Sequence, residues 1–316
     1  MKKVVVIGGG TGMSNLLSGL KQFPLDITAV VTVCDDGGST GVLREEFNIP
    51  AVGDIRRVLV ALSETEPLVM DLFNYRFDSS KGLGEHTVGN LLLTAASDIT
   101  GNLADGIEAL SKVLNLKGKV IPLTEDNVTL MATMADGRII EGEHNITAEK
   151  SKIDRVYYKE DAIPTKEALK AIKHADLILF SMGSLYTSVI PNLLIEDVVK
   201  EIEKSKAPIM YVCNMMTQPG ETDDFTVTDH IKILNQYLGK RKVDVVLANT
   251  GDIDSKLSEF YLVKEQKDPV RYDKENIDKY NLQVIEDDFI YITPNNLLRH
   301  DNIKLGFHIF YYLMRK

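Results

Sequence analysis

The chain has 316 residues, of which 44% are hydrophobic, and a formal net charge of -10. Its isoelectric point of about 5.2 argues against nucleic acid or an anionic membrane surface as the main partner. With only two cysteines, Cys34 and Cys213, and no secretory signal or long apolar segment, the chain is expected to be cytoplasmic with reduced thiols.

The first predicted element is a buried parallel strand at Val4–Ile7, where a run of β-branched residues suits a strand covered on both faces. Glycines follow at once, and Met13–Leu20 is predicted to be a helix whose N-terminus points at the glycine turn. Free N–H groups and the helix dipole favour an anion at such a turn. The residues predicted to cradle a phosphate there are Gly9, Gly10, Thr11 and Gly12.

This turn matches the dinucleotide fingerprint Gly-x-Gly-x-x-Gly only in part. Gly8 and Gly10 occupy the first two positions, but Met13 stands at the third. Asp35 and Asp36 lie near the distance at which an acidic residue normally holds the ribose of a dinucleotide. NAD is therefore one candidate ligand. The alternative without a ligand is a glycine turn that only packs the helix on the strand.

The second predicted strand, Ile27–Val33, runs into a loop of acidic, glycine and hydroxyl residues at 35–41. A carboxylate such as Asp36 suits a hydrated Mg²⁺ ion or a ribose, while a solvated turn is the alternative without a ligand. The hydroxyls of Ser39 and Thr40 can donate to phosphate oxygens.

A helix is predicted at Arg56–Leu62, with Asp54 as its N-cap. Arginine binds phosphate in a planar, bidentate manner, and Arg56 is the candidate here. Arg57 points in a different direction and is expected to lie in solvent.

The next predicted helix, Thr87–Ala96, begins beside a histidine. His86 is a candidate phosphate donor or general base, although a lone histidine is as often structural. Asn90, in the first turns of this helix, can reach a base edge or a sugar hydroxyl.

A helix is predicted at Asn102–Leu114 and a short strand at Lys119–Ile121, after which the alternation of strand and helix stops. Val128–Met134 and Arg138–Glu141 flank an Asp-Gly pair, which is typical of a β-hairpin. Residues 122–158 are therefore predicted to be an antiparallel β insertion.

Strand and helix then alternate again, in the order Lys166–Lys173 helix, Asp176–Phe180 strand, Leu193–Lys204 helix, Pro208–Cys213 strand, Thr228–Leu238 helix and Val243–Ala248 strand. Residues 252–288 are highly charged and are interpreted as a solvated excursion with a short helix. A last strand, Phe289–Ile292, and a helix, Asn302–Met314, complete the pattern.

This alternation predicts an α/β fold: a Rossmann-like, doubly wound, mainly parallel sheet with helices on both faces, in a single domain over residues 1–316. The carboxyl ends of parallel strands share one edge, where ligands bind at the topological switch point. Loops rich in small polar residues follow five of the predicted strands, after Ile7, Val33, Phe180, Cys213 and Ala248. They are predicted to form one rim around a phosphate-rich ligand.

Later loops add further candidates. Gly183 and Ser184 belong to a hydroxyl-rich loop suited to a diphosphate or a sugar, and Asn214 lies in another strand-end loop. Tyr261 can stack on a base, or simply pack, and Arg299 can close the site from the C-terminal side. Neither a Cys/His cluster with metal-ligand spacing nor a Walker A lysine is present in the sequence.

Together these motifs resemble the YvcK branch of the YvcK/CofD-like family. The matching stretches are residues 8–12, 35–41, 53–56, His86 with 89–90, 183–188 with 191–192, and 299–301. One departure is Ser181-Met182-Gly183, where the family usually has Gly-Pro-Gly.

The resemblance implies a cytoplasmic protein that binds UDP-N-acetylglucosamine, needs no cofactor, and acts in cell shape and wall synthesis during gluconeogenic growth. It leaves open a cell-wall regulatory protein as partner, a homo-oligomer, and the transferase chemistry of the CofD branch on a nucleotide-diphosphate-linked substrate. If the protein is a transferase, the candidate catalytic residues are Asp36, as a Mg²⁺ ligand, and His86. An NAD-binding protein is the third hypothesis.

Overall fold

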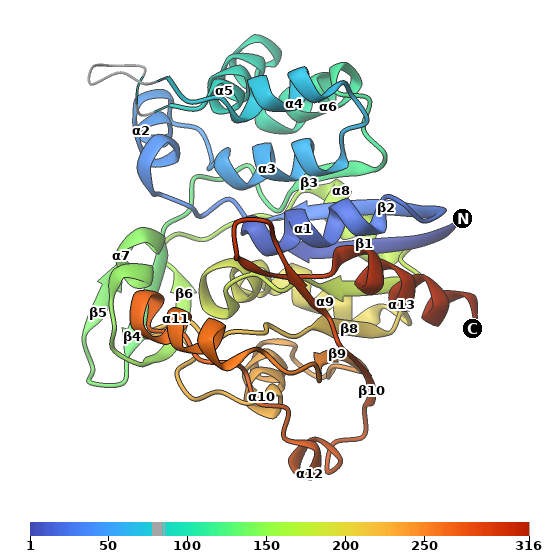
Figure 1. Ribbon diagram of the computed structural model, residues 1–316. Helices are drawn as coiled ribbons and strands as arrows, with labels where there is room; N and C mark the ends of the chain where they lie inside the picture. Colours follow the sequence, from blue (N-terminus) through green and yellow to red (C-terminus); the bar gives the residue numbers. More distant parts are fainter. Residues whose placement is uncertain (78–83, 85, 316) are drawn as a thin grey trace.

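The computed structural model describes residues 1–77, 84 and 86–315, and its centre is a seven-stranded sheet (Figure 1). Every neighbouring pair of strands in this sheet is parallel. In spatial order the strands are β10 (Gln283–Asp287), β9 (Val245–Asn249), β8 (Ile209–Val212), β7 (Leu177–Phe180), β1 (Lys2–Gly8), β2 (Leu25–Val31) and β3 (Lys119–Pro122).

The first strand explains why its sequence is continuously apolar. Val4 and Val6 belong to one hydrophobic core, whereas Val5 and Ile7 belong to a second core on the opposite face. Successive side chains of a strand point to opposite faces, so both faces of β1 need apolar residues.

Helices cover both faces of the sheet, which confirms the doubly wound fold. One core is completed by α1 (Gly10–Leu20), α3 (Gly53–Leu62) and α13 (Asn302–Met314). The other is completed by α8 (Lys166–Lys173), α9 (Glu196–Lys204) and α10 (Val227–Tyr237). An outer layer over α3 consists of α2 (Gly38–Phe47), α4 (Pro67–Asn74), α5 (Val88–Thr100) and α6 (Leu103–Val113) (Figure 1).

The predicted insertion is a three-stranded antiparallel sheet in the order β5 (Ile139–Glu141), β4 (Leu130–Met134), β6 (Ile153–Tyr158). The hairpin around the Asp-Gly pair is confirmed, with Gly137 at a φ of 88°. A short helix, α7 (Glu143–Ala148), follows β5 and packs against the turn of helix η2 (Leu185–Val189), which η3 (Ile190–Leu193) continues.

The interpretation of residues 252–288 as a solvated excursion is wrong in part. They form α11 (Ser255–Glu265), α12 (Lys274–Ile277) and the edge strand β10 of the main sheet. An edge strand is only half covered, and the side chains of β10 are intermediate or exposed. This is why its sequence lacks the apolar run of the central strands.

The predicted last strand is also placed differently. Ile290–Ile292 forms β11, which pairs antiparallel with β12 (Leu298–His300) in a separate two-stranded sheet. This hairpin carries the chain back toward the carboxyl edge of the main sheet before α13 begins (Figure 1). Within the described residues, none of the helices has the length and apolar character needed to cross a bilayer.

The packing of α1 against α13 depends on a glycine. A Cβ atom added at Gly19 would lie 1.9 Å from the backbone oxygen of Asn302, so the two helices touch through their backbones. We expect Gly19→Ala to push α13 away and to lower the stability by about 1–3 kcal/mol, measured as a drop in melting temperature. Ser18→Ala is the control, since Ser18 is only half-buried; equal melting temperatures for the two variants would contradict this packing.

Candidate functional site

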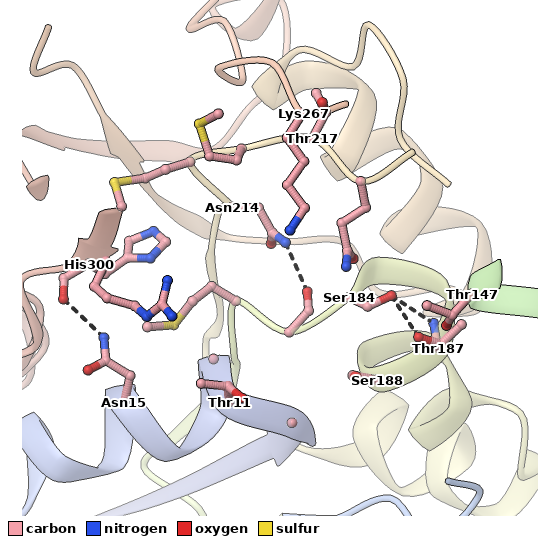
Figure 2. A pocket seen from close by; sticks show the side chains of 18 of the residues that line it. Thr11, Asn15, Thr147, Ser184, Thr187, Ser188, Asn214, Thr217, Lys267 and His300 are labelled. Carbon is pink, nitrogen blue, oxygen red and sulfur yellow. Dashed lines mark hydrogen bonds between the residues drawn. The ribbon is translucent and has the colours of Figure 1, made fainter. Parts of the chain in front are cut away.

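A cavity of about 490 Å³ opens at the carboxyl edge of the sheet, between the ends of β1 and β7 (Figure 2). The chain passes outward from β1 through β2 to β3, and then restarts on the other side of β1 with β7. The cavity therefore lies at the topological switch point, where the sequence predicts a ligand site.

Strand-end loops from distant parts of the sequence meet around this cavity. Its walls include residues that follow β1, β2, β7 and β8, namely Gly10, Thr11, Gly12, Asp35, Gly183, Ser184 and Asn214. The loop after β9 is not among them, because Asn249 turns back to bond Gly251 and the N–H of Phe289. Four of the five predicted loops are thus brought together, and the fifth stabilises its own turn.

The anion position at the glycine turn is filled by the protein itself. The N–H of Gly10 donates to Oδ2 of Asp54 at 2.8 Å, and Asp54 is only 5% exposed. Asp54 therefore does not serve as the N-cap of α3, a position held by Val52. A bound phosphate has to use the neighbouring first-turn N–H groups of Thr11 and Gly12, which have no partner within the helix.

On α3, the arginine that lines the cavity is Arg57, not the predicted Arg56. Arg57 forms an ion pair with Asp54 and lies 4.0 Å from the carboxylate of Asp35. Burial and the charge of Asp54 raise the pKa of Asp35. Arg56 instead points to Asn74 on α4, and burial together with Arg57 lowers its pKa to about 10.

The hydroxyl-rich loop after β7 forms a closed hydrogen-bond network. Ser184 donates its proton to the buried carboxylate of Glu221. The N–H and hydroxyl of Thr187 both donate to the Ser184 oxygen (Figure 2). Ser184 therefore lines the cavity with its hydrogen bonds already satisfied. This arrangement favours a positioning role over the nucleophilic role that an activated serine plays.

Glu221 gives this network a pH dependence. Burial raises the pKa of Glu221 from the ordinary 4.5 to about 7, so the folded state binds a proton that the unfolded state has lost. The stability that this proton provides is fully present below pH 4.5 and is lost as the pH rises to about 7.

We expect Glu221→Gln to gain roughly 3 kcal/mol relative to the wild type between pH 4.5 and pH 8, since each pKa unit corresponds to about 1.4 kcal/mol. Urea denaturation across this range measures the difference. Glu45→Gln, at an exposed glutamate of α2, should show no such trend. A constant difference between Glu221→Gln and wild type would contradict the buried proton.

Two further candidates line the cavity but are fixed in place. Asn214 donates to the carbonyl of Gly183 at 3.0 Å (Figure 2). It also accepts from the hydroxyl of Tyr211. Tyr261 is only 4% exposed, and its hydroxyl accepts from the N–H of Leu298 at 2.8 Å. Tyr261 thus contributes mainly to packing beneath the hairpin β11–β12, as expected if it does not stack on a base.

Arg299 stands where two cavities meet. A second cavity of about 790 Å³ shares with the first the residues Thr11, Asn15, Arg57, Arg299 and His300. Arg299 is exposed, and its guanidinium bonds only its neighbouring carbonyl, of Leu298, in the described part of the chain. It therefore offers a cation without a carboxylate partner. Burial lowers the pKa of His300 to about 4, so this ring is neutral.

The remaining predicted residues lie outside both cavities. Asp36 accepts from the N–H of His144 at 2.8 Å and so holds α7. A separate polar cluster between α2, α3 and α5 contains Ser39, Thr40, Arg56, His86 and Asn90, where Ser39 bonds both His86 and Asn90. Gly9 lies behind the turn, where a Cβ atom would meet Asp54 at 2.4 Å.

Metal binding at Asp36 receives no support from its neighbours. No group of three or more His, Cys, Asp or Glu side chains in the described ranges is arranged to hold a metal ion. Asp36 is engaged with the insertion, and the carboxylates that line the cavity are Asp35, Asp54, Glu143 and Glu265, the last of which is paired with Lys267.

Sequence reasoning missed the residues that reach the cavity from outside the strand ends. Glu143 comes from the insertion and Lys267 from the segment after α11, and both line the cavity. Glu221, in the loop after β8, does not line it but accepts a hydrogen bond from Ser184, which does. No local motif marks them. The only available signal was that Glu221 lies in a polar strand-end loop.

Comparisons with known proteins agree with this geometry. The model of the CofD family, described as 2-phospho-L-lactate transferase CofD, matches residues 4–290. The gluconeogenesis factor of Bacillus subtilis is 46% identical over 305 residues, which cover 96% of each chain. A putative gluconeogenesis factor of Thermotoga maritima is 44% identical over 312 residues, covering 96% of this chain and 97% of that protein.

The fold is similar to a crystal structure as well. A protein from Bacillus halodurans superimposes with a TM-score of 0.93 at 45% identity, covering 98% of this chain and 99% of that one. The similarity therefore includes the cavity-forming loops, the insertion and the C-terminal hairpin.

Proposed function

The chain belongs to the CofD family, as its motifs predict. On this basis we propose that it is a regulatory protein that binds UDP-N-acetylglucosamine in the cavity at the topological switch point. The observation that carries the proposal is Arg299, a cation without a carboxylate partner in the described part of the chain, at the mouth of a cavity lined by backbone and hydroxyl groups.

The cavity has the size and chemistry of a small-molecule site. Its volume of about 490 Å³ lies within the ordinary range of ligand pockets, roughly 300–1,000 Å³. The first-turn N–H groups of α1, Arg299 and Lys267 supply donors for a diphosphate, and Thr147, Thr187 and Ser188 supply hydroxyls for a sugar. Charge-assisted hydrogen bonds of about 1.5–3 kcal/mol each are sufficient for micromolar binding after association costs.

The relatives carry the name gluconeogenesis factor, which supports a role in gluconeogenic growth. We propose that this protein acts in the cytoplasm, supports cell shape and wall synthesis during gluconeogenic growth, and passes the level of the nucleotide sugar to a cell-wall regulatory protein. Ser184, saturated by Thr187 and Glu221, supports binding over nucleophilic catalysis.

Isothermal titration calorimetry tests the proposal directly. UDP-N-acetylglucosamine should bind with a saturable heat in the micromolar range, more tightly than GDP or NAD. The absence of heat at millimolar UDP-N-acetylglucosamine would reject it, and tighter binding of NAD would favour the dinucleotide hypothesis.

A second candidate function is a transferase that acts on a nucleotide-diphosphate-linked substrate. The second cavity favours it, because a donor in the first cavity and an acceptor in the second would meet at Arg299. Product release from nucleotide-diphosphate-linked donors, assayed with Mg²⁺, is expected only for this candidate, and no turnover with any donor would reject it.

A further inference from the structure

The insertion contributes an acid to the cavity wall. Glu143 is the first residue of α7, and this helix packs against η2, which follows the loop after β7. The N–H of His144 is held by Asp36 at 2.8 Å, and the hydroxyl of Thr147 donates to the Glu143 carboxylate at 3.1 Å. These bonds fix the carboxylate in the cavity, where it lies near Thr187.

Positive and negative charges are unequal at this end of the cavity. Asp35, Asp54 and Glu143 face the same space, and Arg57 is the guanidinium that pairs with the first two. Glu143 forms no ion pair within the described residues: Lys267 pairs with Glu265, and Arg57 acts on Glu143 only through its charge. If all three acids are ionised, this end of the cavity carries an excess of negative charge before any ligand enters.

The groups that act on Glu143 come from every element around it. They are Cys34 and Asp35 after β2, Asp54 and Arg57 on α3, Thr147 on α7 itself and Thr187 on η2. On the neighbouring strand β5, Glu141 is paired with Lys159 and does not line the cavity. Burial, followed by the charge of Asp35, raises the pKa of Glu143 to about 7, against the hydrogen bonds from Thr187 and Thr147. A nucleotide diphosphate entering the cavity adds negative charge beside this group and raises its pKa further.

We propose that Glu143 is a ligand-binding residue that is protonated in the complex, so that the cavity takes up a proton from solvent together with a nucleotide diphosphate. The proton neutralises the carboxylate, and the Glu143 hydroxyl becomes a donor to an oxygen of the ligand. This inference rests on the proposed function and deepens it, because it makes binding weaker as the pH rises.

Calorimetry in buffers of different ionisation enthalpy measures the proton uptake. With UDP-N-acetylglucosamine and EDTA, the wild type should take up about half a proton at pH 7, less at pH 6, and a larger fraction at pH 8. Glu143→Gln should bind without proton uptake and with an affinity that no longer falls between pH 6 and pH 8. Glu141→Gln, on the same insertion but outside the cavity, should behave as the wild type does.

The outcomes separate this inference from the proposed function. Binding with a heat that does not depend on the buffer overturns the inference alone, and so does an unchanged proton uptake in Glu143→Gln. Proton uptake that disappears when Mg²⁺ replaces EDTA also overturns the inference, because a bound cation, and not a proton, then neutralises the carboxylates. No binding heat at any pH overturns both.

Discussion

Replacing Arg299 by alanine is expected to weaken the binding of UDP-N-acetylglucosamine by roughly 10- to 100-fold, the loss of one charge-assisted contact of about 1.5–3 kcal/mol. The guanidinium is exposed at the junction of the two cavities and bonds only its neighbouring carbonyl in the described part of the chain. Because no buried partner depends on it, the melting temperature should stay unchanged. Titration calorimetry and thermal denaturation of the same sample measure both quantities.

The matched control is Arg155→Ala, at an exposed arginine on β6 that lies over the ring of Tyr157. It removes the same charge from the molecule without touching either cavity. Equal losses of affinity in the two variants would show that only the overall charge matters. Full affinity in Arg299→Ala would place the diphosphate elsewhere.

The second large effect is expected on stability, from Asp54→Ala. This change removes the acceptor of the Gly10 N–H and the ion-pair partner of Arg57, both at the start of α1 and α3. The part-buried N–H of Gly10 then loses its acceptor and Arg57 keeps only Asp35, 4.0 Å away, which together costs about 3 kcal/mol. For a chain of this size the melting temperature should fall by roughly 5 °C or more.

Asp54→Asn separates the two contributions, since an amide oxygen still accepts from Gly10 but carries no charge. We expect its melting temperature to lie between those of the wild type and Asp54→Ala. Asp161→Ala, at an exposed aspartate in the loop before α8, should leave the melting temperature within about 1 °C. A stable Asp54→Ala would mean that the glycine turn does not need the carboxylate.

The fold was predictable because it depends on local patterns. A strand buried on both faces needs an apolar residue at every position, as Val4–Ile7 shows, and this leaves a signal in consecutive residues. The edge strand Gln283–Asp287 escaped notice because half of its surface is uncovered, so its sequence resembles that of a charged loop.

Part of the site was predictable for the same reason. Loops at the carboxyl ends of parallel strands must share an edge, and this alone brought Thr11, Gly183, Ser184 and Asn214 together. The sequence did not show which residue within a loop or helix faces the ligand. Consecutive residues of a helix point about 100° apart, and only the packing of α3 shows that Arg57 faces the cavity while Arg56 faces α4.

The sequence by itself determined the alternating α/β architecture, the glycine turn at the first strand, the hairpin insertion and the family, because each is written in neighbouring residues. The tertiary structure alone decided that Asp54 occupies the anion position at Gly10, that Glu221 lies beneath Ser184, and that the insertion brings Glu143 into the cavity. Such contacts join residues that are far apart in the sequence. Ser184 and Glu221 are 37 positions apart, and Asp36 and His144 are 108 positions apart. No local pattern encodes such pairs, since only the packing of the whole chain brings their side chains within bonding distance.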